Sequence, residues 1–192
     1  CYLFVHMQSL NLPQVPLWAM VFINRTSSPW ILFWNDLEGK FNMKLTIHRG
    51  ANAIGGSCVE LMTDSSRIII DLGMPLVDSK KQPFDSKSIA GKSIEELKTE
   101  KTLPDIKGLY KDEQPQIDAI LISHSHLDHY GLLDFANDKI PVYISQGAKE
   151  LVKVTNIFLN KNIKLTDTRI IKHKSPFHIK DFKITPYLVD HS

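Results

Sequence analysis

A run of apolar residues that ends in a cluster of histidines limits what this chain can fold into more than any other feature. Residues 117–122 are nearly all aliphatic, and such a run predicts a strand buried on both faces. Eight histidines in 192 residues would place fewer than one in an average window of six, yet the window 124–129 holds three histidines and an aspartate. We therefore predict a buried strand whose carboxyl end carries polar side chains, where α/β folds place their sites.

Alternating strand and helix patterns surround this run. Residues 57–63 and 67–71 predict two strands joined by a short turn, and Ser93 with Glu96 has the capping-box spacing that starts a helix over 93–101. Further strands are expected over residues 141–144, 169–171 and 182–189, and further helices near residues 132–135 and over residues 147–159. This alternation predicts an α/β layered fold.

The first 42 residues differ from the rest of the chain. All three tryptophans lie there, no acid precedes Asp36, and no helical or strand period holds for long. A patterned region starts at Met43. We therefore divide the chain into an N-terminal extension of unassigned role, residues 1–42, and a domain over residues 43–192.

Composition excludes several classes of protein. The hydrophobic content of 43% and the charged content of 23% are those of a globular protein with one substantial core. The two cysteines, Cys1 and Cys58, do not indicate a disulfide framework, so we expect reduced thiols and a cytoplasmic location. The most apolar stretch, residues 13–34, is interrupted at residues 24–29, so we expect no membrane-spanning helix.

Positive charge is unevenly distributed along the chain. The formal net charge is only +2, but residues 139–183 contain ten Lys and Arg against three acids, Glu150, Asp167 and Asp181. This local excess of seven positive charges suits an anionic substrate. A solvated face rich in lysine is the more common explanation of such a stretch, and both interpretations stay open. The sequence gives no prediction of oligomeric state.

The residue types in the histidine cluster indicate metal chemistry. Imidazole nitrogen and carboxylate oxygen are the ligand types of catalytic zinc sites, whereas thiolates are common in structural ones. A charged loop without a ligand role would not require three imidazoles within six residues. The isolated histidines are expected to have ordinary surface or core roles: His48, His173 and His178.

The run HSHLDH at residues 124–129 resembles the HxHxDH signature of the metallo-β-lactamase superfamily. Two more segments match in order. Residues 68–73 resemble the strand that ends in the first-motif aspartate, here Asp71, and residues 189–192 resemble the strand that delivers the third-motif histidine, here His191. The resemblance covers the whole patterned domain. It implies an α/β fold of the αββα sandwich type, of which this chain would contain the N-terminal half only.

The resemblance also assigns roles to individual residues around two zinc ions. The first ion would be held by His124, His126 and His191, and the second by Asp128 and His129. Asp128 would be the catalytic residue of this set. Asp71 would orient the ligand loop through hydrogen bonds, as carboxylates behind metal ligands often do, and an aspartate of an ordinary turn is the alternative. The bridging aspartate and the final histidine of the family have no counterpart here, which predicts a domain truncated at its C-terminus.

Smaller similarities indicate one group within the superfamily. Residues 103–106 and 140–143, and the ending 190–192, resemble ribonuclease J-type nucleases of the β-CASP group. This resemblance implies a hydrolase that cleaves RNA phosphodiester bonds with metal-activated water, with RNA as its substrate. Two alternatives stay open: a small-molecule hydrolase of the same fold that acts on thioesters or lactones, and a metal-binding protein without catalysis.

Overall fold

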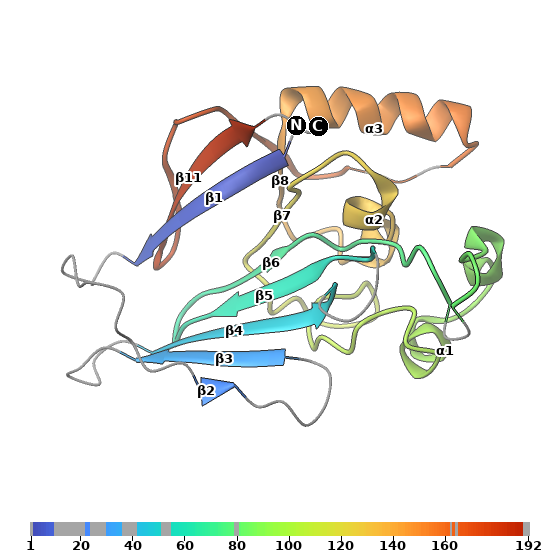
Figure 1. Ribbon diagram of the computed structural model, residues 1–192, viewed down its shortest axis with the longest axis horizontal. Helices are drawn as coiled ribbons and strands as arrows, with labels where there is room; N and C mark the ends of the chain where they lie inside the picture. The colour runs from blue at the N-terminus through green and yellow to red at the C-terminus, as the bar shows by residue number, and fades with distance from the viewer. Residues whose placement is uncertain are drawn as a thin grey trace.

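The computed structural model describes residues 2–9, 22–23, 30–35, 42–50, 55–78, 81–161, 163 and 165–189. Its strands form two sheets (Figure 1). The larger sheet contains, in spatial order, β2 (Phe22–Ile23), β3 (Trp30–Asn35), β4 (Asn42–Arg49), β5 (Cys58–Met62), β6 (Arg67–Ile70), β7 (Ala119–Leu121), β8 (Val142–Ser145) and β9 (Thr168–Ile171). The smaller sheet contains β1 (Tyr2–Ser9), β11 (Phe182–Val189) and β10 (Phe177–Ile179).

Strand direction changes within the larger sheet. Neighbouring strands from β2 to β6 are antiparallel, whereas β6, β7, β8 and β9 run parallel to one another. The expected hairpin is confirmed, because β5 and β6 pair antiparallel. All three residues of β7 are fully buried, as expected for a strand with both faces covered.

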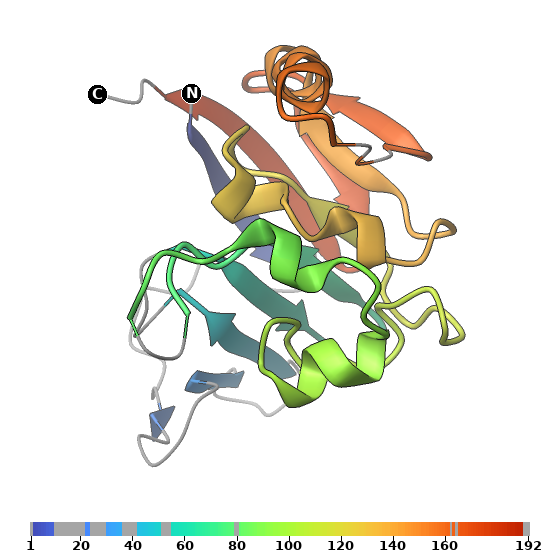
Figure 2. The ribbon, with the colours of Figure 1, turned by 90° about the vertical axis from the view of Figure 1, so that its right-hand side faces the viewer.

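The elements form three successive layers. The helices are α1 (Ile94–Thr99), α2 (Leu127–Tyr130) and α3 (Gln146–Phe158), and they pack on one face of the larger sheet through an apolar cluster that includes Leu97, Tyr130 and Val152. The opposite face packs against the smaller sheet through a second cluster that includes Leu121 and Phe182. In Figure 2, α1 and α2 lie in front of the sheets, and the pair β1 and β11 lies behind. Helix, sheet and sheet therefore follow one another in the order expected for an αββα sandwich.

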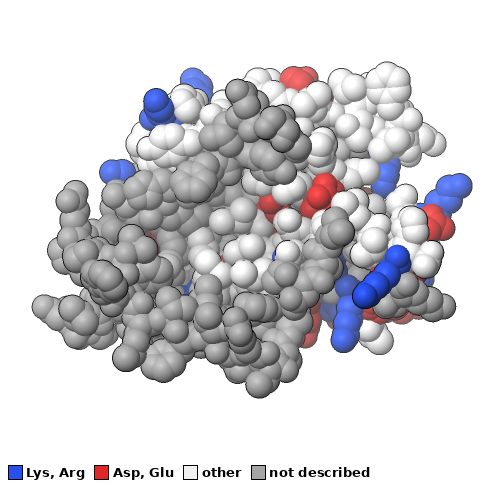
Figure 3. All heavy atoms as spheres, viewed as in Figure 1, with Lys and Arg blue, Asp and Glu red and all other residues white. Residues whose placement is uncertain are grey.

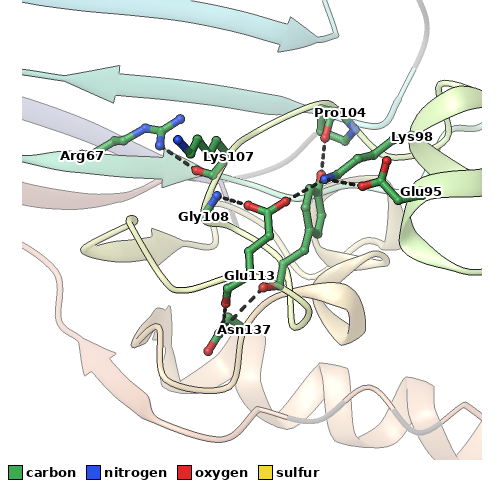
Figure 4. Close-up of polar contacts among 9 residues, drawn as sticks. Arg67, Glu95, Lys98, Pro104, Lys107, Gly108, Glu113 and Asn137 are labelled. Carbon is green, nitrogen blue, oxygen red and sulfur yellow. Dashed lines mark hydrogen bonds and ion pairs between the residues drawn. The ribbon is translucent and has the colours of Figure 1, made fainter.

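The segment between β6 and β7 folds against the helical face of the larger sheet. It contains the one-turn 3₁₀ helix Ser86–Ile89 and then α1, whose start has the predicted capping box between Ser93 and Glu96. Polar contacts then fix its return toward β7 (Figure 4). The Lys98 ammonium lies 2.7 Å from the Glu113 carboxylate, and the Asn137 amide donates to the Glu113 carbonyl at 2.8 Å.

A buried charged group connects the antiparallel strands beneath this segment. Glu60 of β5 is only 6% exposed and accepts hydrogen bonds from His48 of β4, at 2.7 Å, and from Arg67 of β6. Burial alone would raise the pKa of Glu60, but the hydrogen bonds and positive charges of its two partners lower it to about 2. Arg67 also donates to the Lys107 carbonyl at 2.7 Å, as Figure 4 shows. The group therefore joins three strands to the segment that covers them.

Three features differ from the sequence-based expectations. No strand was expected before residue 43, but β1 pairs with β11 over eight residues and β3 pairs with β4 over six. β10 was not anticipated, and the helix expected near residues 132–135 is a short 3₁₀ turn that follows α2. The division into residues 1–42 and 43–192 stays a prediction, although strands on both sides of it share sheets. Within the described ranges, no helix is long and apolar enough to cross a membrane.

Candidate metal centre

The predicted site residues lie at one edge of the larger sheet, where two parallel strands end. β6 and β7 are paired with Ile70 opposite Leu121. The next residue, Asp71, continues this pairing, because its amide donates to the Leu121 carbonyl at 2.9 Å. Asp71 has a φ of 61°, in the left-handed region, and the chain leaves the sheet here. The carboxyl ends of both strands therefore bring Asp71 and the histidine loop to the same edge.

The second half of the histidine run is a single helical turn that backbone hydrogen bonds hold in place. His126 is the N-cap of α2, so Asp128 and His129 lie on the helix itself. Three successive carbonyls of this turn accept N–H groups from segments next to β5 and β6. The pairs, each at 2.9 Å, are Met74 N with Leu127 O, Ser57 N with Asp128 O, and Leu72 N with His129 O. These bonds fix the path of the backbone that carries both side chains.

This close backbone packing requires a glycine at position 73. Gly73 lies between two of the donors, and its own N–H donates to the Ser57 carbonyl at 3.0 Å. A Cβ atom on Gly73 would lie 1.7 Å from the Asp128 carbonyl oxygen and 2.8 Å from the Ser57 nitrogen. Any side chain at this position would therefore displace α2 from the end of β6.

Asp71 connects Ser123, which follows β7, to His129 of α2. Its buried carboxylate accepts the backbone N–H of Ser123 at 2.8 Å and the Ser123 hydroxyl at 2.6 Å. It also lies 2.8 Å from Nδ1 of His129. Because an ionised carboxylate only accepts hydrogen bonds, Nδ1 carries the proton, and Nε2 is the nitrogen suited to bind a metal. Asp71 therefore lies where a residue that orients the ligand loop should lie, and its role at a metal stays a prediction.

His129 has an unusual electrostatic environment. Burial of its ring opposes the charged form, but the hydrogen bond with Asp71 and the negative charges of Asp71 and Asp128 outweigh burial and raise the pKa of His129. The ring is consequently a stronger base than an ordinary histidine. Stronger basicity is also what a carboxylate partner gives to an imidazole that binds a metal.

The three histidine rings gather around His124. Its ring centroid lies 4.1 Å from that of His126 and 5.3 Å from that of His129, both in edge-on orientation. Nε2 of His129 lies 3.7 Å from a carboxylate oxygen of Asp128. His124 is buried, Asp128 and His129 are half-buried, and His126 is exposed. The group therefore extends from the core to the surface.

The chemistry of this donor set fits zinc. Three imidazoles and one carboxylate from a single loop are ligand types that catalytic zinc sites use. In the part of the chain that the structure describes, no three His, Cys, Asp or Glu side chains are placed to hold one ion together. The family resemblance gives each ion only two described ligands, since His191 lies outside the described residues. The structure brings four of the five proposed ligands to one edge, and their assignment to metals stays a prediction.

Sequence reasoning did not identify two residues that support the loop. Ser123 was not singled out, although a polar residue between a buried strand and the histidine run was an available signal. The contact between Gly73 and α2 could not be anticipated either, because it joins segments more than fifty residues apart in the chain. Both residues act on the candidate ligands through contacts that only the tertiary structure shows.

The three isolated histidines are either bonded to groups outside the histidine run or exposed. His48 belongs to the Glu60 network. Nδ1 of His173 accepts the backbone N–H of Leu188 at 3.0 Å, and His178 is exposed on β10. These contacts agree with the ordinary roles that the sequence analysis expected for them.

Several positive charges between residues 139 and 183 have acidic partners. Lys153 pairs with Glu150 at 2.9 Å, and Lys180 pairs with Asp118 at 2.6 Å. On the face seen in Figure 3, described Lys and Arg side chains are dispersed rather than gathered in one patch. Glu150 is already subtracted in the local excess of seven, whereas Asp118 lies outside residues 139–183 and lowers the positive charge of this stretch further.

Comparison with known proteins supports the family resemblance. Residues 98–192, which include the histidine run, match the β-lactamase superfamily domain. A protein of unknown function from Enterococcus faecalis V583 has a similar fold, with a TM-score of 0.58 and 21% sequence identity over 72% of this chain and 35% of that chain. The match over residues 98–192, together with the layered fold, shows that this part of the chain is a metallo-β-lactamase superfamily domain.

Two curated relatives come from Methanocaldococcus jannaschii. A protein named probable RNase MJ4 is 29% identical over 144 residues, which are 73% of this chain and 27% of the relative. A protein named RNase J-like protein is 28% identical over 111 residues, 58% of this chain and 20% of that relative. This chain therefore spans about a quarter or less of the length of these relatives, both of which are named as RNases.

Proposed function

We propose that this chain carries part of the active centre of a zinc-dependent ribonuclease that resembles ribonuclease J. The observation that supports this most is the convergence of Asp71 and the histidine run at the edge where β6 and β7 end, in a chain whose relatives bear RNase names. The same names favour a nuclease over a thioester or lactone hydrolase. A cytoplasmic location stays a prediction from the cysteine content.

The proposed ligands divide into two groups. We assign the first zinc ion to His124, His126 and His191, and the second to Asp128 and His129. When bound, two such ions would lower the pKa of water and stabilise the negative charge of a phosphodiester during hydrolysis. The protein holds Asp128 and His129 on one helical turn and fixes the proton of His129 on Nδ1. These contacts fix the backbone that carries both side chains and orient the His129 ring before a metal binds.

Metal content and RNA cleavage test this proposal directly. The full-length natural protein should purify with close to two zinc ions per chain. His126→Ala and Asp128→Ala should lower the zinc content and abolish cleavage of single-stranded RNA, whereas the exposed His178→Ala should change neither. Equal losses in all three variants, or a zinc content near zero in preparations made without chelator, would contradict the assignment.

RNA binding by the lysine-rich stretch is a separate part of the proposal. Lys172 and Lys174 are exposed, and no described acid pairs with either. In a catalytically silent His126→Ala background, their joint replacement by Gln should weaken binding and reduce the slope of log K against log salt by about 1–2. Lys153→Gln is the matched control, since Glu150 already compensates Lys153. An unchanged slope in the double variant would show that these lysines do not contact the RNA.

A further inference from the structure

The Ser123 side chain lies next to the last proposed ligand of the histidine run. Its hydroxyl donates to Asp71 at 2.6 Å and lies 3.1 Å from Nδ1 of His129. Its backbone N–H donates to the other Asp71 oxygen at 2.8 Å. Ser123 therefore donates hydrogen bonds to both oxygens of the Asp71 carboxylate, and this carboxylate in turn bonds to His129.

This arrangement limits how Asp71 and His129 can move. A carboxylate held at both oxygens cannot rotate without breaking a hydrogen bond, so Asp71 presents one fixed oxygen to Nδ1 of His129. The nitrogen opposite, Nε2, then keeps its direction relative to α2. Because Asp71 is 4% exposed, water is poorly placed to replace a missing hydroxyl.

From these contacts we propose that Ser123 is a positioning residue, which fixes the Asp71 carboxylate and thereby the tautomer and orientation of His129. This inference rests on the proposed zinc site and adds a specific consequence to it. The Ser123 hydroxyl bonds to Asp71 and lies next to His129, so its effect should fall on the second zinc ion, to which we assign His129. The two ions should therefore respond differently to its removal.

Metal affinity tests the proposal in the full-length natural protein. Affinity for each zinc ion is measured by chelator competition in Ser123→Ala, Ser123→Thr and the matched control Ser125→Ala. Ser125 lies in the same loop, and its side chain makes no hydrogen bond to a described residue. Ser123→Ala should weaken one of the two ions about tenfold, toward the lower end of losses caused by removing partners of metal ligands. Ser123→Thr, which keeps a hydroxyl, should restore the affinity, and Ser125→Ala should match the parent.

A second measurement needs no metal. In the chelator-treated parent at alkaline pH, where the His129 ring is neutral, ¹⁵N NMR should show one tautomer with the proton on Nδ1. Ser123→Ala should shift it toward a mixture that Ser123→Thr does not show. Parent-like affinity and an unchanged tautomer in Ser123→Ala would overturn the proposal. Equal weakening of both ions, or failure of Thr to rescue, would also overturn it, because either result indicates general damage to the loop. A parent that binds no zinc would refute the proposed function, and the tautomer would still test the role of Ser123.

Discussion

Replacing Gly73 with alanine should separate the helical turn of the histidine run from the end of β6. The new Cβ would lie 1.7 Å from the Asp128 carbonyl oxygen, whereas ordinary contacts are 3.4–4 Å. The two backbones would therefore have to move apart by about 1.7 Å or more to restore normal contact. A movement of that size would break the Ser57 N–Asp128 O bond, now 2.9 Å, and would strain the two bonds on either side.

The loss of unfolding free energy in Gly73→Ala follows from these buried hydrogen bonds. A buried backbone group left without its partner costs about 1–3 kcal/mol, and one broken bond with two strained ones gives an expected loss of about 3–5 kcal/mol. That is a large share of the roughly 5–15 kcal/mol that stabilises a typical domain. Because α2 carries Asp128 and His129, the zinc content should fall together with the stability.

Equilibrium urea unfolding, followed by circular dichroism, measures this effect. Gly147→Ala is the control, since Gly147 lies in α3 and a Cβ there meets no atom within 4 Å. Alanine in a helix is favoured over glycine, so the control should be unchanged or more stable by up to about 1 kcal/mol. If Gly73→Ala stays within about 0.5 kcal/mol of the parent and keeps its zinc, the argument from close backbone packing is wrong.

Two further predictions concern residues away from the candidate centre. The pKa of Glu60, about 2, lies below its unfolded value, so the Glu60 network should stabilise the fold above about pH 4.3 and lose this contribution as the pH falls toward 2. The loss is at most about 3 kcal/mol, since one pKa unit corresponds to about 1.4 kcal/mol. Denaturation series at several pH values would measure it, and an equally steep pH dependence in Glu60→Gln would contradict it. Ser93→Ala should lower the unfolding free energy by about 1 kcal/mol through loss of the α1 cap, without changing zinc content; a parent-like unfolding free energy would show that the cap contributes nothing.

The sequence predicted those elements whose signals are local. The aliphatic run over residues 117–122 identified the buried strand β7, and the spacing of Ser93 and Glu96 identified α1, because a strand buried on both faces and a capping box each have a short-range pattern. β1 and β10 were missed because their formation depends on pairing with another strand, β11, and not on a local pattern. Both belong to the smaller sheet, where their pairing with β11 joins segments that no local pattern connects, least of all β1 and β11 at opposite ends of the chain.

The candidate site likewise combines features that a local sequence pattern predicts with contacts that it does not predict. The composition of the run at residues 124–129 indicated metal chemistry, and the family resemblance led to the assignment of its ligands, to His191 and to Asp71. The supporting contacts could not be predicted, because Ser123 bonds to Asp71 across 52 positions in the chain, and Gly73 packs against α2 more than fifty positions away. The residue types of a ligand set can thus be seen in a sequence, whereas the groups that orient them depend on which strand ends become neighbours.

Chelation should leave the fold of this domain intact. The carbonyls of Leu127, Asp128 and His129 are all satisfied by backbone N–H groups, and Asp71 holds His129 without help from a metal. Apolar clusters on both faces of the larger sheet supply the main stabilisation of the fold. This domain therefore differs from small domains that fold only when zinc is bound. A bound ion would therefore add stability through binding alone, about 2.7 kcal/mol at a free concentration one hundred times its Kd. Chelator-treated protein should accordingly keep its far-ultraviolet circular dichroism and a cooperative transition at a lower Tm. If chelation abolished both the circular dichroism signal and the cooperative transition, the metal, and not the strand ends, would organise the histidine loop.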